Sequence, residues 1–222
     1  MQIKETFSLG SSVPAGYPTS LGYFLTTPTD FDPAKERLPL ILFLHGAGER
    51  GTGIDIVKVN GIPKVFAADP DYHGLRVITL SPQCPDNMVW SDIIHLVKAL
   101  TDEIAAKYNC DPDRITCTGL SMGGFGTWSM GIRFNDYFAA IAACCGGGRS
   151  WEADRLKKIP VRAYHGLKDG AVEPIYSQLM VDAVNRCGGH AELFTYPETG
   201  HDVWVPAYEQ TDLIEWLAAA HK

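Results

Sequence analysis

The sequence predicts a single α/β domain in which a mostly parallel sheet is covered by helices on both faces. Short apolar runs alternate along the chain with helix-compatible stretches, as in folds built from strand, helix and strand units. The chain has 222 residues, of which 45% are hydrophobic and 20% charged, values typical of a globular protein with one core. We therefore expect residues 1–222 to form one domain.

Seven strands and four helices are expected. The run 38–44, Leu-Pro-Leu-Ile-Leu-Phe-Leu, is apolar throughout, as a strand buried on both faces should be. Residues 21–26 indicate an earlier, antiparallel strand. The other strands are expected over residues 75–80, 114–118, 139–143, 161–165 and 191–196, and the helices over 91–108, 122–133, 173–186 and 207–220.

Residues 119–123, Gly-Leu-Ser-Met-Gly, lie between the expected strand 114–118 and the expected helix 122–133. A G-x-S-x-G segment in that position forms a sharp, strained turn whose glycines let the serine hydroxyl stand above the sheet edge. The segment predicts that Ser121 is a nucleophile. A glycine-rich turn with an incidental serine is the plainer interpretation, and other residues have to decide between the two.

Attack by such a serine on a carbonyl group requires hydrogen-bond donors for the oxyanion that develops. The run 38–44 ends in His45-Gly46-Ala47-Gly48, a loop of the kind that supplies one donor. Each backbone N–H aimed at the oxyanion contributes about 2.7–4 kcal/mol. We assign the two donors to Met122, directly after the serine, and to Ala47.

The same loop also fits a dinucleotide-binding fingerprint. Residues 46–51 match G-x-G-x-x-G, and Asp71 follows about twenty residues later, where a ribose-binding acid is expected. That acid should stand at the end of the second strand of the unit, whereas Asp71 precedes the next expected strand within a turn-rich stretch. A nucleotide-binding role is disfavoured, and no cofactor is expected.

Two further residues complete a set in the chain order Ser, Asp, His. Asp169 lies in the loop after the expected strand 161–165, and His201 follows the last expected strand. There a histidine can act as general base toward Ser121 while the aspartate fixes its tautomer. Singly, Asp169 fits a turn and His201 a helix start. Their joint placement with Ser121 at one sheet edge favours a catalytic triad.

The chain resembles the α/β-hydrolases over about residues 20–220, in particular small serine esterases of the phospholipase/carboxylesterase type and their neighbours among predicted peptidases, feruloyl esterases and polyhydroxybutyrate depolymerases. The resemblance rests on residues 45–51, 81–83, 119–124, 165–169 and 200–202. It implies that Ser121, Asp169 and His201 form the triad, and that Ala47 and Met122 form the oxyanion hole. The motifs are specific for the superfamily, but the substrate does not transfer with them.

The charge and hydropathy of the chain limit the classes of partner that it can bind. The net charge is −7, from 19 basic and 26 acidic residues, which argues against nucleic acid or an anionic membrane. No apolar run is long enough to cross a bilayer, and residues 1–8 have no signal-like apolar core. We expect a cytoplasmic protein, or an exported one if a leader was removed. Its partner is a small-molecule ester, and the sequence does not give the oligomeric state.

Neither a metal site nor disulfides are expected. The six cysteines are scattered through the chain, the seven histidines do not cluster, and C-x-x-C and H-E-x-x-H motifs are absent from the sequence. Buried free thiols are the better interpretation. The serine at position 121 also argues against the cysteine-nucleophile dienelactone hydrolases of the same fold.

Specificity is less well determined. Residues 144–160 are too few for a separate cap domain, which predicts an open site. Tentative substrate contacts in loops near the expected site edge are Gln83, Trp90, Trp151 and Trp204. Packing is an equal alternative for each tryptophan. Glu49 and Arg50 either pair to hold the oxyanion loop or form a solvated surface pair.

Together these features predict a serine hydrolase that cleaves small or medium carboxylic esters through an acyl-enzyme. A peptidase or amidase of the same fold is the alternative among enzymes. A catalytically silent ligand-binding version of the fold is the alternative outside them. The complete triad disfavours the silent version, because a binding module has no need of all three residues.

Overall fold

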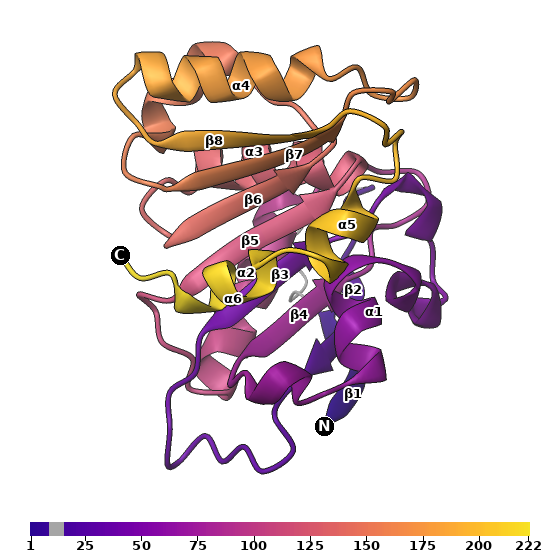
Figure 1. The fold of residues 1–222 in the computed structure, drawn as a ribbon. Coiled ribbons are helices and arrows are strands. Elements are labelled where there is room, and N and C mark those ends of the chain that lie inside the picture. Colours follow the sequence, from indigo (N-terminus) through magenta and orange to yellow (C-terminus); the bar gives the residue numbers. More distant parts are fainter. Residues whose placement is uncertain (9–15) are drawn as a thin grey trace.

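The computed structural model describes residues 1–8 and 16–222, which form one eight-stranded sheet covered by helices (Figure 1). The strands lie in the order β1-β2-β4-β3-β5-β6-β7-β8. Neighbours from β4 to β8 run parallel, whereas β2 pairs antiparallel with both β1 and β4. The fold class expected from the sequence is confirmed.

The sequence analysis missed one strand, β1. Within it only Phe7 is fully buried, so no apolar run reveals the strand; it forms as an edge by pairing with β2. The other strands match or lie close to the expected runs. The strands are β1 Gln2–Ser8, β2 Ser20–Thr26, β3 Leu40–Leu44, β4 Ile78–Pro82, β5 Ile115–Leu120, β6 Ala140–Cys144, β7 Val161–Gly166 and β8 Ala191–Tyr196.

Helices cover both faces of the sheet because alternate strand residues point to opposite sides. Leu40, Leu42 and Leu44 of β3 pack in a cluster with α2, α3 and α4. Ile41 and Phe43 pack in a second cluster with α1, α5 and α6, the helices in front of the sheet in Figure 1. The α-helices are α1 Gly61–Ala68, α2 Ile94–Lys107, α3 Met122–Arg133, α4 Ile175–Arg186, α5 Trp204–Glu209 and α6 Leu213–Ala219.

The expectation of one final helix over 207–220 is wrong, because the segment divides into α5 and α6. Thr211 Oγ1 donates to the carbonyl of Ala207 at 2.6 Å and accepts the N–H of Leu213 at 3.2 Å. A hydroxyl that binds backbone groups locally competes with the helical pattern. The chain therefore turns between the two helices.

The described part of the chain also contains four short 3-10 helices: η1 Ala47–Glu49, η2 Ile54–Val59, η3 Tyr72–Gly74 and η4 Ser150–Leu156. Between β6 and β7 the chain contains only η4, in agreement with the expected lack of a cap domain. Within residues 1–8 and 16–222, no helix has both the length and the apolar composition that a bilayer crossing requires.

The start of α3 lies unusually close to the end of β3. A Cβ added to Gly123 would overlap the carbonyl oxygen of Leu44, and one added to Gly119 would lie 2.6 Å from the same oxygen. Backbone carbonyls cannot move aside as a flexible side chain can. Glycine at these two positions therefore sets how closely α3 approaches the sheet.

We expect Gly123→Ala to destabilise the protein by about 3 kcal/mol or more, at or beyond the upper end of ordinary overpacking, because backbone has to shift. Chemical denaturation measures the loss. The matched control is Gly170→Ala, where an added Cβ meets nothing within 4 Å. Equal stability of the two variants would contradict the close approach.

Candidate active site

Ser121 stands in a strained turn between β5 and α3. Its backbone has φ 53° and ψ −117°, a conformation that residues other than glycine rarely adopt. Its N–H donates to the carbonyl of Cys144 at 2.9 Å, and its carbonyl accepts the N–H of Phe125 at 3.1 Å. Such strain persists only where the surroundings enforce it, and it concentrates at functional sites. This is the geometry that the G-x-S-x-G segment predicts.

The structure brings the three residues of the expected triad into hydrogen-bond contact. His201 follows β8, and its Nε2 lies 2.9 Å from Ser121 Oγ. The other ring nitrogen, Nδ1, lies 2.8 Å from Oδ2 of Asp169, in the loop after β7. Because β5, β7 and β8 are parallel, their carboxyl ends meet at one sheet edge and bring these loops together. The side chain of Asp202 has no hydrogen bond to His201 among those of the described residues.

The Asp169 carboxylate is held on both oxygens. Its Oδ1 accepts the N–H groups of Ala171 and Val172, each at 2.9 Å. Its Oδ2 faces His201 and also His165, whose Nε2 lies 3.3 Å away. Burial raises the pKa of Asp169, but the hydrogen bonds from His201 and from the two backbone groups outweigh burial and lower it overall. Asp169 is therefore a carboxylate at neutral pH.

His165 fastens the loop that carries Asp169. The ring is fully buried, and its Nε2 lies 2.9 Å from the carbonyl of Val172. Nε2 faces acceptor oxygens only, from Val172 and Asp169, and therefore carries a proton. On the other side of the ring, Nδ1 lies 2.7 Å from Oγ of Ser177. His165 thus holds the loop from Gly166 to Val172 around the Asp169 carboxylate. The sequence had suggested no role for this histidine.

The expected oxyanion donors lie next to the same turn. Met122 is the first residue of α3, where an N–H has no acceptor within its own helix. Ala47 opens η1 directly after Gly46, and a Cβ added to Gly46 would lie 2.8 Å from Leu120 Cδ1, beside the serine. The loop after β3 therefore lies against the residue that precedes Ser121.

A buried histidine supports this loop. His45 Nε2 accepts the N–H of Cys84 at 2.9 Å, so the ring proton is on Nδ1 and is donated to the carbonyl of Gly46 at 2.6 Å. Trp90 Nε1 donates to the His45 carbonyl at 2.9 Å, and the two rings meet edge to face. Burial lowers the pKa of His45 to about 4, so the ring is neutral at neutral pH.

Solved structures share this arrangement of strands and helices. A thermostable esterase is 31% identical to the chain and superimposes with a TM-score of 0.85, over 100% of this chain and 63% of that protein. The chain therefore has the α/β-hydrolase fold. It spans about 63% of the length of that esterase. No protein-family model and no curated protein sequence matches the chain.

More distantly similar structures have the same fold. A feruloyl esterase module from Clostridium thermocellum, solved with sinapinate, is 15% identical, with a TM-score of 0.74 over 99% of this chain and 86% of that one. An acylaminoacyl peptidase from Pyrococcus horikoshii is 14% identical, with a TM-score of 0.67 over 93% of this chain and 39% of that one. At these identities the likeness concerns the fold alone.

The structure corrects one of the four tentative substrate contacts, Gln83, and shows that a second, Trp90, is almost fully buried. Gln83 is 3% exposed, and its amide nitrogen donates to the carbonyls of Glu49 and Gly53, so it supports the loop. Trp90 is 2% exposed and its Nε1 is held by the His45 carbonyl, but the residue still lines a cavity beside Met122. Gln83 lost its expected role because tertiary packing turned its amide inward.

The other two tryptophans differ in position. Trp151 on η4 is 76% exposed and lines neither cavity next to α3. Trp204, at the start of α5, meets the ring of His201 edge to face at 5.2 Å between centroids. Of the four tentative contacts, only Trp204 touches a residue of the expected triad.

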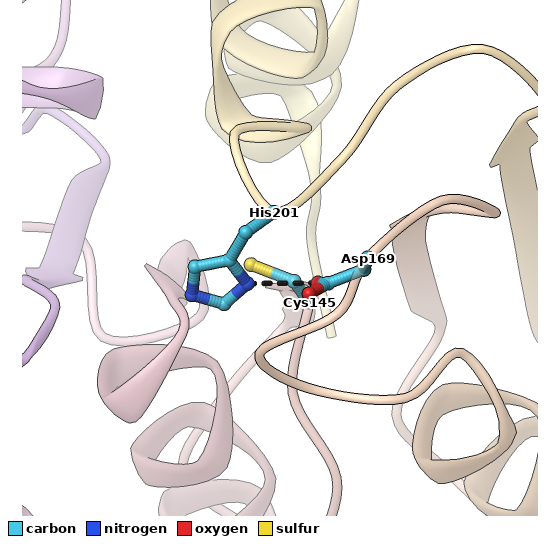
Figure 2. Close-up of side chains that lie close together, drawn as sticks. All are labelled: Cys145, Asp169 and His201. Atoms are coloured by element: carbon cyan, nitrogen blue, oxygen red, sulfur yellow. Dashed lines mark hydrogen bonds and ion pairs between the residues drawn. The ribbon is translucent and has the colours of Figure 1, made fainter.

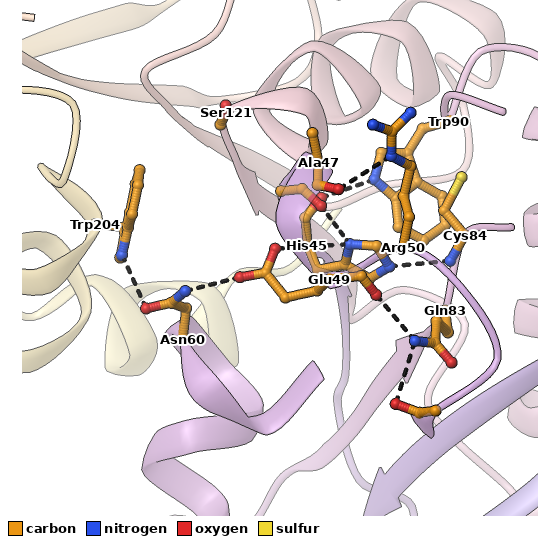
Figure 3. Close-up of polar contacts among 12 residues, drawn as sticks. His45, Ala47, Glu49, Arg50, Asn60, Gln83, Cys84, Trp90, Ser121 and Trp204 are labelled. Carbon is orange, nitrogen blue, oxygen red and sulfur yellow. Dashed lines mark hydrogen bonds and ion pairs between the residues drawn. The ribbon is translucent and has the colours of Figure 1, made fainter. Parts of the chain in front are cut away.

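A chain of hydrogen bonds connects the loop after β3 to Trp204 (Figure 3), whose ring contacts His201. Oε1 of Glu49 accepts from Asn60 Nδ2 at 2.7 Å, and Asn60 Oδ1 accepts from Trp204 Nε1 at 3.1 Å. Glu49 and Arg50 form no ion pair with each other within residues 1–8 and 16–222. Arg50 instead donates from Nε to the carbonyl of Ala47 at 3.0 Å. Both residues hold the loop, but through separate contacts.

Cys145 lies close to both His201 and Asp169 (Figure 2). Its sulfur, a carboxylate oxygen of Asp169 and a ring nitrogen of His201 all lie within 4.8 Å of one another, so their atoms are close enough to hold a metal ion. However, burial raises the pKa of the Cys145 thiol, and metals bind the thiolate. Asp169 and His201 are also bonded to each other. The chemistry of the set therefore does not favour a metal site.

Sequence reasoning missed His165, Asn60 and Cys145 as neighbours of the site. For His165 a signal existed, since the pair His165-Gly166 ends a buried strand three residues before Asp169. Asn60 and Cys145 carried no comparable pattern. They reach the site only because η2 and β6 end next to it.

The pH dependence of stability tests the neutral state of His45. Because its pKa falls from 6.5 to about 4 on folding, its contribution is complete above pH 6.5 and is lost as the pH falls from 6.5 to 4. The loss amounts to about 3 kcal/mol. We expect His45→Gln to flatten this part of the curve in chemical denaturation from pH 7 to 4.5. The exposed His221→Gln serves as control, and an equally steep curve in both variants would refute the assignment.

Proposed function

We propose that the protein is a serine hydrolase that cleaves carboxylic esters through an acyl-enzyme. The observation that supports this proposal is the continuous path from Ser121 Oγ through His201 to Asp169, at 2.9 and 2.8 Å. Nucleophile, base and orienting acid lie in hydrogen-bond reach in the order that acyl transfer requires. Similarity to a thermostable esterase over the whole chain favours esters among the possible acyl compounds.

In the first step, Ser121 Oγ attacks the ester carbonyl carbon and transfers its proton to His201 Nε2. The negative charge that develops on the carbonyl oxygen is stabilised by the N–H groups of Met122 and Ala47. Asp169 accepts the hydrogen bond from Nδ1 of the resulting imidazolium, and its charge stabilises that cation. The aspartate keeps its own charge throughout.

In the second step, His201 returns the proton to the departing alkoxide, which leaves as the alcohol, and Ser121 remains acylated. A water molecule then attacks the acyl carbon while His201 takes one of its protons. Collapse of the second tetrahedral intermediate returns this proton to Ser121 and releases the acid. The same ring nitrogen thus acts alternately as base and acid.

We expect a fluorophosphonate probe to label the wild-type protein at Ser121, because His201 activates that hydroxyl. Ser121→Ala should abolish both labelling and ester hydrolysis, whereas Ser20→Ala, on an exposed β2 position, should retain both. Mass spectrometry locates the label, and 4-nitrophenyl acetate reports hydrolysis. Labelling that persists in Ser121→Ala would contradict the assignment of Ser121 as the nucleophile. Faster cleavage of a matched anilide than of the ester would instead indicate an amidase.

A pair of variants tests the orienting acid. Asp169→Asn should lower kcat by about 10⁴, the loss that follows when a triad aspartate becomes an amide and the histidine tautomer is wrong. Asp202→Asn should change kcat little, since its side chain is exposed and its neighbour His201 is bonded to Asp169. Steady-state kinetics under identical conditions compares them. A large loss at Asp202 with a small one at Asp169 would reverse the roles.

A further inference from the structure

A groove runs along α3 away from Ser121. It consists of two cavities of about 530 and 390 Å³ that share Ser91, Phe125 and Ser129, so they form one continuous hollow. We call it the α3 groove. Its near end is lined by Met122, the residue after the serine, and its far end by Arg133 and Arg149.

The two arginines lie far from Ser121, but both line the groove that leads away from it. Arg133 is eleven residues after Met122 in α3, which at 1.5 Å per residue places it about 16 Å along the helix. The loop that carries Arg149 passes the middle of the helix, since a Cβ added to Gly148 would lie 2.8 Å from Cβ of Trp128. That point is about 9 Å along the helix from Met122.

Between these ends the walls are aromatic and apolar. The rings of Phe125 and Tyr176 meet edge to face at 6.0 Å, and Gly147 lies against both. Ile94 also lines the groove. An extended chain can lie here, because apolar area removed from water contributes about 25 cal/mol per Å².

The charge of the groove is opposite to that of the protein. The chain has 26 acidic and 19 basic residues, yet the described residues that line the α3 groove include two arginines and no aspartate or glutamate. Arg133 has no carboxylate within ion-pair distance in residues 1–8 and 16–222. Arg149 pairs with Glu152 at 3.2 Å, an exposed contact of little strength that a second carboxylate can replace.

We propose that the α3 groove selects esters whose acyl chain ends in a carboxylate, with Arg133 and Arg149 binding that distal anion. Guanidinium groups match carboxylates geometrically and stay charged at every working pH. In an acidic protein they also provide a local attraction for a ligand that the net charge repels. This inference rests on the proposed esterase function, because it places the ester carbonyl at Ser121.

A ladder of substrates tests the proposal. We compare 4-nitrophenyl monoesters of adipic, suberic, sebacic and dodecanedioic acid with the same compounds carrying a methyl ester on the distal carboxyl. Wild-type kcat/KM should favour the free acid about fivefold for the longer chains and not for adipate, which does not reach the arginines. The preference should disappear in high salt.

Charge variants identify the residues responsible. In Arg133→Gln/Arg149→Gln the ratio of acid to methyl ester should fall to about one, and Arg133→Glu/Arg149→Glu should reverse it. The control is Lys35→Gln/Arg37→Gln, which removes the same charge from the exposed loop before β3, at the opposite sheet edge. If the control changes the ratio as much as the groove variants do, general charge explains the effect and the proposal is wrong.

The outcomes distinguish failure of the α3 groove proposal from failure of the proposed esterase function. Hydrolysis of 4-nitrophenyl acetate without any preference for the long free acids overturns the α3 groove proposal and leaves the esterase standing. If no ester is hydrolysed, the esterase proposal fails. Calorimetric binding of the sebacate monoester to Ser121→Ala then tests the groove alone: binding weakened about fivefold by the arginine-to-glutamine pair supports it, and equal binding refutes it.

Discussion

The close contact between the start of α3 and the end of β3 is the constraint on which the site depends. Gly123 allows the helix to approach the carbonyl of Leu44 without a clash, and Ser121 takes up the resulting tight turn with a positive φ. The same approach places the loop after β3 against Leu120, the residue before Ser121. The strained turn at Ser121 and the position of the loop that carries Ala47 thus both depend on one packing contact, in which the backbone sets the distance.

The loops around this contact are held by buried polar groups whose partners come from distant parts of the chain. His45 joins the loop to Cys84, Glu49 joins it to Asn60, and His165 closes the loop around Asp169. A buried polar group is costly when unpaired, so each such side chain fixes its loop in the one position that satisfies it. The loops after β3 and β7 are therefore held at this sheet edge by buried contacts.

The α3 groove differs in charge from the rest of the protein, and the proposed selectivity depends on this difference. An acidic surface favours solubility but repels anions over long range, whereas two arginines act over a few ångströms at the end of an apolar path. The proposed selection depends on length as well as charge, because a ligand would have to reach the arginines with its ester at Ser121. In this proposal the groove supplies the specificity that the chain between β6 and β7, which contains only η4, does not provide as a cap.

The sequence by itself determined the alternation of strands and helices, the turn at Ser121 and the order of Asp169 and His201, because each depends on local spacing and on glycines within a few residues. Tertiary structure alone decided the rest. Gln83 and Trp90 were expected at the substrate and are buried, because the atoms that satisfy their polar groups come from remote segments. The support of the Asp169 loop by His165 and the charge of the α3 groove likewise arise from residues that meet only when parallel strands align, which no pattern along the chain records.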